Sequence, residues 1–331
     1  MKPQEQIHQI LETYGGETAD KAVKVLLEDP ALSGFKPFME FISKNWRDPF
    51  VPSLMHLSCK SVNGNPEQIE ETAIAFSLIN LSLRILDDII DKTWSRKFRT
   101  TYVGKFGEEN SLVIGNIISA KAFTILNQAN LDSNKKQKII KLIWIYLAQM
   151  AEVEIKYFMS KNELTAKNKL DKIKNETINV QTCLKIGAII GDGPMETNAA
   201  LAQYGECLGT LLELQKDIQV SLNLTLELAG KIKVNALPYL MLKAKESSLD
   251  IENEIDRLRK NQITPDRIER LVDMLLNSKV IAPTKRTIRL LSANGVKSLA
   301  TLERNIEKEK LRNIIKAQEQ TIISLLTEFR N

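Results

Sequence analysis

Apolar side chains recur every three or four residues along most of the chain, a spacing that places them on one face of a helix. Alternating apolar and polar runs of the kind that strands show are hard to find, and Gly and Pro are few. The pattern therefore predicts an all-α fold, a bundle of roughly ten to thirteen helices. From residue 108 onward the expected helices lie near 108–129, 135–161, 170–190, 196–228 and 238–245.

Breaks in this pattern divide the chain into three parts. Residues 1–45 are expected to form two short amphipathic helices, and residues 46–245 a core. The tail, residues 246–331, is helical in pattern, strongly charged and broken at Pro265 and Pro283, so we expect it to wrap the outside of the core. Because no internal repeat and no linker rich in Gly, Ser or Pro is found, the sequence predicts one domain of 331 residues around a central apolar cavity.

The stretch Ala73–Asp91 is apolar almost throughout and ends in three carboxylates. On a helix, Asp87 and Asp91 share one face, and Asp88 lies about a quarter-turn round. Acidic side chains near a helix C-terminus oppose the macrodipole by roughly 0.3–1 kcal/mol each, and their crowding adds repulsion. The sequence therefore predicts a buried helix with an acidic tip that needs a counter-charge.

Magnesium would supply such a charge, because Mg²⁺ takes a few carboxylate oxygens and keeps other coordination positions open for a phosphate. We predict that Asp87 and Asp91 are Mg²⁺ ligands and that Asp88 is a partial ligand or supports them from behind. The alternative is a solvated helix end that is acidic by chance. Arg84, four residues before Asp88, is expected to form an ion pair with it rather than to bind substrate.

The amino-acid composition limits the kinds of ligand and catalytic site that the sequence allows. With 43% hydrophobic and 26% charged residues the chain is typical of a globular protein, and a net charge of +5 spread along the sequence gives little indication of nucleic-acid binding. A small ligand that carries phosphate suits this charge better. Since His8 and His56 are the only histidines, sites built on several histidines are nearly excluded, and the chemistry must come from carboxylates and cations.

The cysteines and the apolar segments indicate the cellular location. Cys59, Cys183 and Cys207 are odd in number, far apart and set among apolar residues, which indicates reduced thiols in the core of a cytoplasmic protein. The N-terminus has no hydrophobic signal region, and no stretch approaches the length of a membrane span. We therefore expect a cytoplasmic protein without a transmembrane segment.

The residues after the three aspartates add a resemblance to a known family. Asp87–Asp91, followed by a basic connection, resembles the first aspartate-rich motif of the trans-isoprenyl diphosphate synthases, where the aspartates lead into two arginines and later a Lys-Phe-Gly. The resemblance runs from Trp46 to Leu242, and the first motif is its specific part. The other matching positions are Arg96-Lys97, Lys105-Phe106-Gly107, Gly115–Phe123, Gln149 with Glu152, Lys174 with Thr177, Gly187-Ala188, and Gly205 with Gly209.

This resemblance implies an all-α isoprenoid-synthase fold, Mg²⁺ as cofactor, an allylic isoprenyl diphosphate as substrate, and a homodimer or a heterodimer with an active prenyl synthase. Cations near the motif would contact the diphosphate, and an apolar cavity would receive the isoprenoid chain. Ser82 and Leu83 would floor that cavity without an aromatic plug, which indicates a substrate longer than ten carbons. The implied diphosphate contacts are Arg96, Lys97, Lys105 and Lys174, and the implied cavity residues are Phe76, Ser82, Leu83, Phe123 and Gln149, with Trp144 and Tyr157 as further aromatic candidates.

The family's second aspartate-rich motif is broken in this chain. Lys216 replaces one aspartate of Phe-Gln-x-x-Asp-Asp-x-x-Asp, and Asp217 keeps another. Glu213, Asp217 and Ser221 are four residues apart on one helical face, so a reduced metal site with Glu213 and Asp217 as ligands is one interpretation. The other is that Asp217 pairs with a nearby lysine.

The segment that would bind the second substrate, isopentenyl diphosphate, differs even more from the family's pattern than the second motif does. The family grips this diphosphate with Gly-Lys-Arg-x-Arg-Pro and with a histidine seven residues before the first aspartate. Pro52 matches the proline, but the residues before it keep only Arg47, out of register, and Asn80 stands at the histidine position. Since each charge-assisted hydrogen bond contributes roughly 1.5–3 kcal/mol, a diphosphate would bind there many-fold more weakly.

Together these features predict Mg²⁺-dependent ionisation of an allylic diphosphate. The first interpretation is a terpene synthase built on the isoprenyl diphosphate synthase fold, in which the cation reacts with its own double bonds or loses a proton. The second is a prenyltransferase with an external acceptor, either isopentenyl diphosphate through another site or a group without a diphosphate. The third is a non-catalytic subunit of a heteromeric synthase, which the broken second motif favours and the intact first motif opposes.

Overall fold

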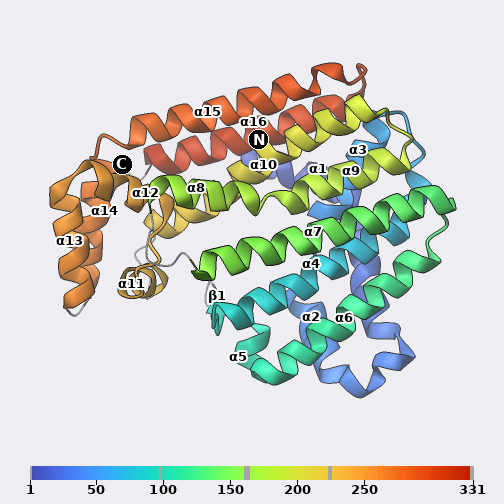
Figure 1. Cartoon of the computed structure of the whole chain (residues 1–331), viewed down its shortest axis with the longest axis horizontal. Coiled ribbons are helices and arrows are strands. Elements are labelled where there is room, and N and C mark those ends of the chain that lie inside the picture. Colours follow the sequence, from blue (N-terminus) through green and yellow to red (C-terminus); the bar gives the residue numbers. More distant parts are fainter. Residues whose placement is uncertain (1, 97–98, 160–164, 223–225, 262, 329–331) are drawn as a thin grey trace.

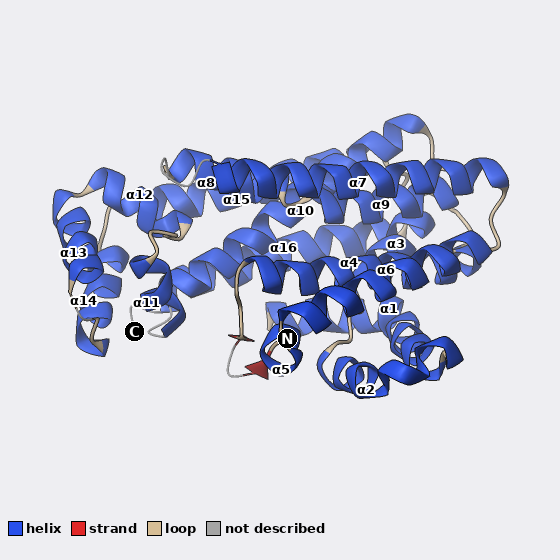
Figure 2. Ribbon diagram, turned by 60° about the horizontal axis from the view of Figure 1, so that its bottom comes forward, coloured by secondary structure: helices blue, strands red, loops and turns tan. Residues whose placement is uncertain are grey.

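The computed structural model describes the chain except for residues 1, 97–98, 160–164, 223–225, 262 and 329–331 (Figure 1). Within the described residues α-helices form nearly the whole architecture, and the one sheet consists of two very short strands (Figure 2). In this part of the chain no helix is both long enough and apolar enough to cross a membrane. The all-α class expected from the apolar periodicity is confirmed.

The elements follow one another along the chain with short connections. The first part contains α1 (Pro3–Glu28), η1 (Pro30–Phe35), α2 (Lys36–Asn45), α3 (Phe50–Ser61), η2 (Pro66–Gln68) and α4 (Glu70–Ile90). The middle part contains the antiparallel strands β1 (Ser95–Arg96) and β2 (Arg99–Thr100), with Ser95 opposite Thr100, and then α5 (Tyr102–Phe106), α6 (Glu108–Gln128), α7 (Ser133–Met159), α8 (Ala166–Asn175), α9 (Ile178–Ile190) and α10 (Met195–Leu222). The last part contains α11 (Leu226–Lys233), α12 (Tyr239–Ser247), α13 (Leu249–Lys260), α14 (Pro265–Leu276), α15 (Ile281–Ser298), η3 (Leu299–Thr301) and α16 (Ile306–Glu328).

Helix α4 lies inside the bundle because it is apolar on nearly all sides. Every side chain from Thr72 to Ile79 is buried, and α4 packs along α6, α1 and α3. At the contact with α6, the Ser82 hydroxyl donates a hydrogen bond to the carbonyl oxygen of Gly115 at 2.9 Å. This contact places the Ser82 hydroxyl between two helices, and the role of Ser82 at a cavity floor stays a prediction.

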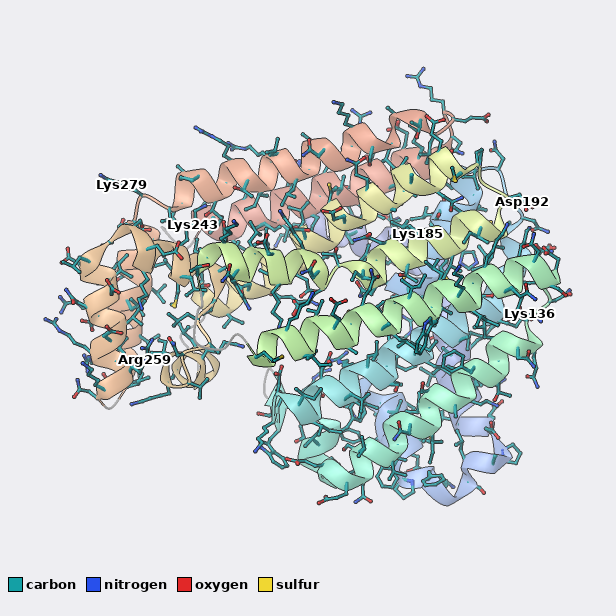
Figure 3. The ribbon with its side chains drawn as sticks, viewed as in Figure 1. Lys136, Lys185, Asp192, Lys243, Arg259 and Lys279 are labelled. Carbon is teal, nitrogen blue, oxygen red and sulfur yellow. The ribbon has the colours of Figure 1, made fainter. Side chains whose placement is uncertain are left out.

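The later helices cover the earlier ones. α15 packs against α10, and α16 against α1, α15 and α3, while α13 and α14 lie with α11 and α12 at one end of the bundle (Figure 1). One cluster of buried apolar side chains extends from Ile10 in α1 to Leu326 in α16. Charged side chains such as Lys136 and Lys279 lie at the periphery (Figure 3). The cysteines are buried free thiols, as expected, and the single-domain interpretation stays a prediction.

One of the expected long helices is divided within the described residues. The predicted helix 170–190 is interrupted at Thr177, whose hydroxyl donates to the Lys174 carbonyl at 2.7 Å and ends α8. The predicted helix 196–228 corresponds to α10 up to Leu222 and to α11 from Leu226, and residues 223–225 lie outside the described part. Apolar periodicity runs across the break at Thr177, which is why the sequence pattern did not reveal it.

A close approach of backbones fixes the crossing of α3 and α9, and it gives a test of the packing. A Cβ added at Gly187 would lie 2.3 Å from the Met55 carbonyl oxygen. We expect Gly187→Ala to lower the free energy of unfolding by about 1–3 kcal/mol, because two backbones must separate. Urea denaturation measures this. Gly230→Ala in exposed α11 is the matched control, since nothing lies within 4 Å of its added Cβ, and an equal loss there would contradict the explanation.

Candidate functional site

One face of α4 is polar in the C-terminal half of the helix. Asn80, Arg84, Asp87 and Asp91 follow one another at three- and four-residue spacing, and all four are half-buried or exposed. Asp88, in contrast, is only 2% exposed. Asp87 and Asp91 therefore share a face, as predicted, whereas the side chain of Asp88 is turned into the protein.

The acidic end of α4 is closed by a sharp turn. The Lys92 N–H donates to the Ile89 carbonyl at 3.1 Å and the Thr93 N–H to the Asp88 carbonyl at 2.8 Å, which is the Schellman pattern of a helix C-terminus. Lys92 has φ +50°, a left-handed conformation that glycine usually takes. The turn holds Asp91 at the C-cap position, directly after α4, and directs the chain away towards β1.

The acidic end suits a divalent metal ion that is shared with a substrate. Within the described ranges no three His, Cys, Asp or Glu side chains are close enough together to hold a metal ion. Magnesium, however, is commonly bound through one or two carboxylates together with substrate phosphates. Asp87 and Asp91 fit that arrangement, because Asp91 is exposed and both carboxylates lie at the negative end of the α4 dipole. We expect metal binding to depend on a diphosphate.

The cations expected to contact a diphosphate are only partly described. Lys97 and the side chain of Arg96 lie outside the described residues. Lys105, on α5, and Lys174, in the last turn of α8, are exposed to solvent. Their roles as diphosphate contacts stay predictions.

Polar and aromatic side chains meet beside the first half of the polar face. The rings of Phe76 and Tyr146 are 5.3 Å apart, and the Tyr146 hydroxyl donates to the Asn80 side-chain oxygen at 2.8 Å. Burial raises the pKa of Tyr146 well above its usual value, so the hydroxyl keeps its proton. Phe76 is fully buried and Leu83 half-buried. At 3.6 residues per turn, Leu83 lies about one turn and Phe76 about three turns before Asp87.

Two implied cavity residues differ from the expectation of an enclosed lining. Phe123 on α6 is 38% exposed, and Gln149 on α7 is exposed as well. Trp144 is 67% exposed, and the side chain of Tyr157 lies outside the described part. The family match at Phe123 and Gln149 identifies positions on a helix but not the face that the neighbouring helix covers.

The remnant of the second motif holds helices together. Asp217 accepts a hydrogen bond from the Tyr239 N–H at the start of α12, at 2.5 Å, and lies 3.4 Å from the Lys169 ammonium on α8. Burial raises the pKa of Asp217, and Lys169 opposes that rise. Glu213 pairs with Lys216 at 2.7 Å. These contacts match the interpretation in which Asp217 pairs with a lysine. They also engage both carboxylates of the alternative interpretation, the reduced metal site of Glu213 and Asp217.

Arg47, the one arginine kept before Pro52, belongs to an ion-pair network at the protein surface. Its guanidinium binds both carboxylate oxygens of Glu12 at 2.8 and 2.9 Å, and its Nε lies 2.5 Å from Asp20. Hydrogen bonds to these two acids raise the pKa of Arg47. Arg47 therefore joins the start of α3 to α1 and is not available to a diphosphate.

This ion-pair network predicts a pH-dependent contribution to stability. Arg47 holds the pKa values of Glu12 and Asp20 below their usual range, so the stabilisation is present above their unfolded pKa values and is lost as pH falls through the folded ones. We expect Arg47→Gln to cost about 1 kcal/mol at pH 7, because the pairs are partly exposed, and progressively less towards pH 3. Urea denaturation at several pH values tests this, with Lys44→Gln as a control, and a loss independent of pH would contradict it.

Asp48 follows Arg47 in the sequence. When Pro52 is aligned with the proline of the family's Gly-Lys-Arg-x-Arg-Pro segment, Asp48 stands at the position of the lysine. It is half-buried and accepts a hydrogen bond from the Phe50 N–H at 2.9 Å, at the start of α3. Burial raises the pKa of Asp48, and the positive charges of Arg84 and Lys216 oppose that rise. The acceptor side of the site thus carries an acid where the family segment carries a base.

Arg84 does not form the ion pair with Asp88 that its spacing in the sequence predicted. Both Arg84 and Asp88 belong to the described residues, yet no ion pair joins the two to each other, and Arg84 is exposed. Sequence reasoning assigned Arg84 to Asp88 from their spacing alone, and it gave no role to Tyr146 or Asp48. The spacing of Asn80, Arg84, Asp87 and Asp91 was the signal that could have placed Arg84 on the same face of α4 as the two aspartates. This polar face of four residues is called the functional face below.

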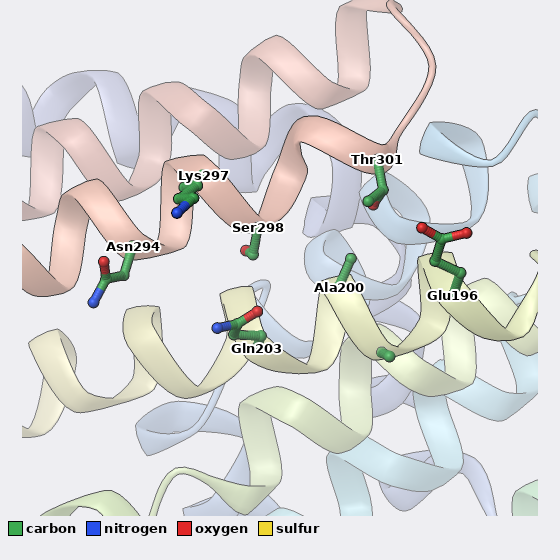
Figure 4. Close-up of a pocket in the computed structure, with 8 residues that line it drawn as sticks. Glu196, Ala200, Gln203, Asn294, Lys297, Ser298 and Thr301 are labelled. Carbon is green, nitrogen blue, oxygen red and sulfur yellow. The ribbon is translucent and has the colours of Figure 1, made fainter.

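A separate groove lies between α10 and α15 (Figure 4). It has a volume of about 560 Å³, and its lining is polar, small and mostly exposed. None of the site residues predicted from the sequence borders it. The lining residues are Glu196, Ala199, Ala200, Gln203, Asn294, Lys297, Ser298 and Thr301.

Comparisons with known proteins agree on one family. A family model described as polyprenyl synthetase matches residues 39–235. Geranylgeranyl diphosphate synthase of Methanosarcina mazei is 22% identical over 289 residues, which cover 84% of this chain and 83% of that protein. Heptaprenyl diphosphate synthase component 2 of Bacillus subtilis is 20% identical over 258 residues, which cover 75% and 72%.

Solved structures share the fold. A polyprenyl synthase from Caulobacter crescentus, in complex with calcium and isoprenyl diphosphate, superposes with a TM-score of 0.81 at 15% identity, over 95% of this chain and 97% of that one. At this identity the likeness concerns the fold, including the order and packing of the helices.

Proposed function

The chain belongs to the polyprenyl synthetase family, and from this premise we propose that it is a prenyltransferase that elongates an allylic isoprenyl diphosphate with a second isoprenoid diphosphate. In such a reaction the allylic carbon–oxygen bond breaks and its electron pair leaves with the diphosphate. The double bond of the acceptor then forms the new carbon–carbon bond, and the acceptor loses a proton. The family and its named relatives support this class of isoprenoid enzyme.

The observation that carries the proposal is the pair Asp87 and Asp91 on one exposed face at the end of a buried helix. A divalent ion bound there, Mg²⁺ by analogy with the family, would neutralise charge on the leaving diphosphate. Asp87 and Asp91 would hold the diphosphate end of the allylic substrate at the C-terminus of α4. Leu83, about one turn deeper, and Phe76, about three turns deeper, would contact its apolar chain and exclude water.

The relatives favour chain elongation over the terpene synthase that the sequence suggested first. The relatives described above are named as diphosphate synthases, and none of these names describes a cyclase or a lyase. The broken second motif, which favours the interpretation as a non-catalytic subunit, keeps Asp217 in contacts with Tyr239 and Lys169. The prenyltransferase alternative therefore fits better.

Product analysis tests the proposal. The purified chain is incubated with Mg²⁺ and C10 to C20 allylic diphosphates, with and without isopentenyl diphosphate, and the products are identified by mass spectrometry. We expect longer diphosphates only when both substrates and the metal ion are present. Hydrocarbons or alcohols from the allylic substrate alone would contradict the proposal in favour of a terpene synthase. No turnover until a partner synthase is added would contradict it in favour of the subunit interpretation.

We further propose that α6 and α7 form the contact to a second copy of the chain. Large apolar side chains lie exposed on both helices, among them Val113 at 52%, Trp144 at 67% and Ile155 at 60%. On α7 no charged residue occurs from Leu142 to Ala151. An apolar surface of this extent is characteristic of a buried protein contact. A second copy is the occupant we favour, and the name of the Bacillus subtilis relative as a component makes a different synthase subunit the alternative.

Replacement of Trp144 tests this contact. We expect Trp144→Glu to shift the purified protein from dimer to monomer, raising the dissociation constant by about a hundredfold or more, because a charge would be buried at the centre of an apolar contact. Light scattering after gel filtration measures the mass. Lys141→Glu, on the same helix and already polar, serves as control. A wild-type chain that is monomeric alone and dimeric only with another synthase would contradict the homodimer.

A further inference from the structure

Arg84 is a cation on the functional face of α4 without an ion-pair partner. It is exposed although every side chain from Thr72 to Ile79 in the same helix is buried, and within the described residues it forms neither an ion pair nor a hydrogen bond. Arg84 precedes Asp87 by three residues, about 4.5 Å along the helix axis at 1.5 Å per residue. Its guanidinium therefore belongs to the same stripe as the predicted metal ligands, one turn deeper.

Helix α4 packs against α3 and α5. The positive charge of Arg84 opposes the rise in the pKa of Asp48, just before α3, and of Tyr102, on α5. The Tyr102 ring is buried and the Asp48 carboxylate half-buried. Lys216, on α10, also acts on the pKa of Asp48, whose carboxylate already accepts a backbone N–H.

The groups that would otherwise bind a second diphosphate near α3 are occupied. Arg47 is held by Glu12 and Asp20. Asn80 accepts the hydroxyl hydrogen of Tyr146 and donates its own N–H to the Phe76 carbonyl at 2.8 Å. A second diphosphate needs cations to compensate its charge, and among the described residues Arg84 and Lys216 are two cations whose charges act on Asp48 at the start of α3.

We propose that Arg84, assisted by Lys216, binds the diphosphate group of the acceptor substrate. This inference rests on the proposed prenyltransferase function. A guanidinium is planar and presents paired N–H donors that match phosphate oxygens, so Arg84 is the main contact in this proposal. Lys216 is exposed and paired with Glu213, and it adds positive charge. An acceptor held one turn from Asp87 would lie beside the allylic substrate, as formation of a bond between them requires.

Asp48 provides a second test of the proposal, because its charge is opposite to that of Arg84. An anionic ligand at Arg84 would be weakened by the Asp48 carboxylate and strengthened when that charge is removed. Asn at this position still accepts the Phe50 N–H, so the start of α3 keeps its hydrogen bond. Arg84→Gln and Asp48→Asn should therefore change acceptor affinity in opposite directions.

A two-step titration tests the inference. The full chain is first saturated with Mg²⁺ and an allylic thiolodiphosphate, which does not ionise, and isopentenyl diphosphate is then titrated calorimetrically. We expect Arg84→Gln to weaken the second binding step by roughly tenfold to a hundredfold and to leave the first within about twofold. Asp48→Asn should tighten the second step by about twofold to tenfold, and Arg270→Gln, in exposed α14, should change neither step.

The outcomes separate this inference from the proposed function. Failure of the wild-type chain to bind the allylic analogue would overturn the proposed function itself. Normal binding of the allylic analogue, together with no second step or with a second step that Arg84→Gln leaves unchanged, would overturn the role of Arg84 alone. Weakening of the first step by Arg84→Gln would assign Arg84 to the allylic diphosphate and would equally contradict the inference. Unchanged thermal unfolding of the variant excludes misfolding as the cause.

Discussion

Asp87→Ala is expected to lower kcat by at least about a hundredfold to a thousandfold, with little change in the unfolding temperature. The Asp87 carboxylate is half-buried on the functional face of α4 and is one of two groups placed to bind the metal ion with the leaving diphosphate. Without it, charge developing on that diphosphate loses its main compensation. Steady-state kinetics with an allylic and an isopentenyl diphosphate measure the change.

Asp91→Ala should behave like Asp87→Ala, because both carboxylates lie on the same face. Asp273→Ala, in exposed α14, is the matched control and should keep wild-type turnover. Retention of turnover in Asp87→Ala would refute the metal assignment. A loss of turnover that accompanied a lower unfolding temperature would show that Asp87 acts through stability, contrary to this account.

Asp217→Ala is expected to lower the free energy of unfolding by about 2–4 kcal/mol. The Asp217 carboxylate is largely buried, accepts the Tyr239 N–H and pairs with Lys169, so its removal loosens α8 and α12 from α10 at once. Urea denaturation at pH 7 measures the loss. If Asp217 were instead a metal ligand, as one interpretation of the sequence proposed, its removal would weaken metal binding and leave stability nearly unchanged.

A pH series provides a second measurement on Asp217. Burial raises its pKa in the folded protein, so this group stabilises the fold most below its unfolded pKa and loses that contribution as pH rises through the folded value. Asp217→Asn, which cannot titrate, should remove this part of the pH dependence. The same series on Asp273→Asn should reproduce the wild-type profile.

The class of the fold and the acidic end of α4 could be predicted because both depend on local sequence. Apolar periodicity identifies helices, and an apolar run that ends in Asp87, Asp88 and Asp91 identifies a buried helix with a polar tip. The orientation of Asp88 was also implicit in the helical geometry. Its quarter-turn offset from Asp87 places it on the packed side of α4.

The remaining features depend on partners far away in the sequence. Asp217 is bound by a backbone N–H of α12 and a lysine of α8, and Arg47 by two acids of α1. Ser82 was expected at a cavity floor but bonds to α6. No local pattern states which neighbour a polar side chain will meet, because that is decided when the helices pack.

The central claim is that Asp87 and Asp91 hold a divalent ion jointly with an allylic diphosphate, and Mn²⁺ binding followed by electron paramagnetic resonance tests it most directly. Free Mn²⁺ is measured with and without an allylic thiolodiphosphate, for the wild-type chain and for Asp87→Asn/Asp91→Asn. This account predicts weak Mn²⁺ binding by the wild-type chain alone, at least tenfold tighter binding with the analogue, and loss of that gain in the double variant. A double variant that binds Mn²⁺ and the analogue as tightly as the wild-type chain would contradict it.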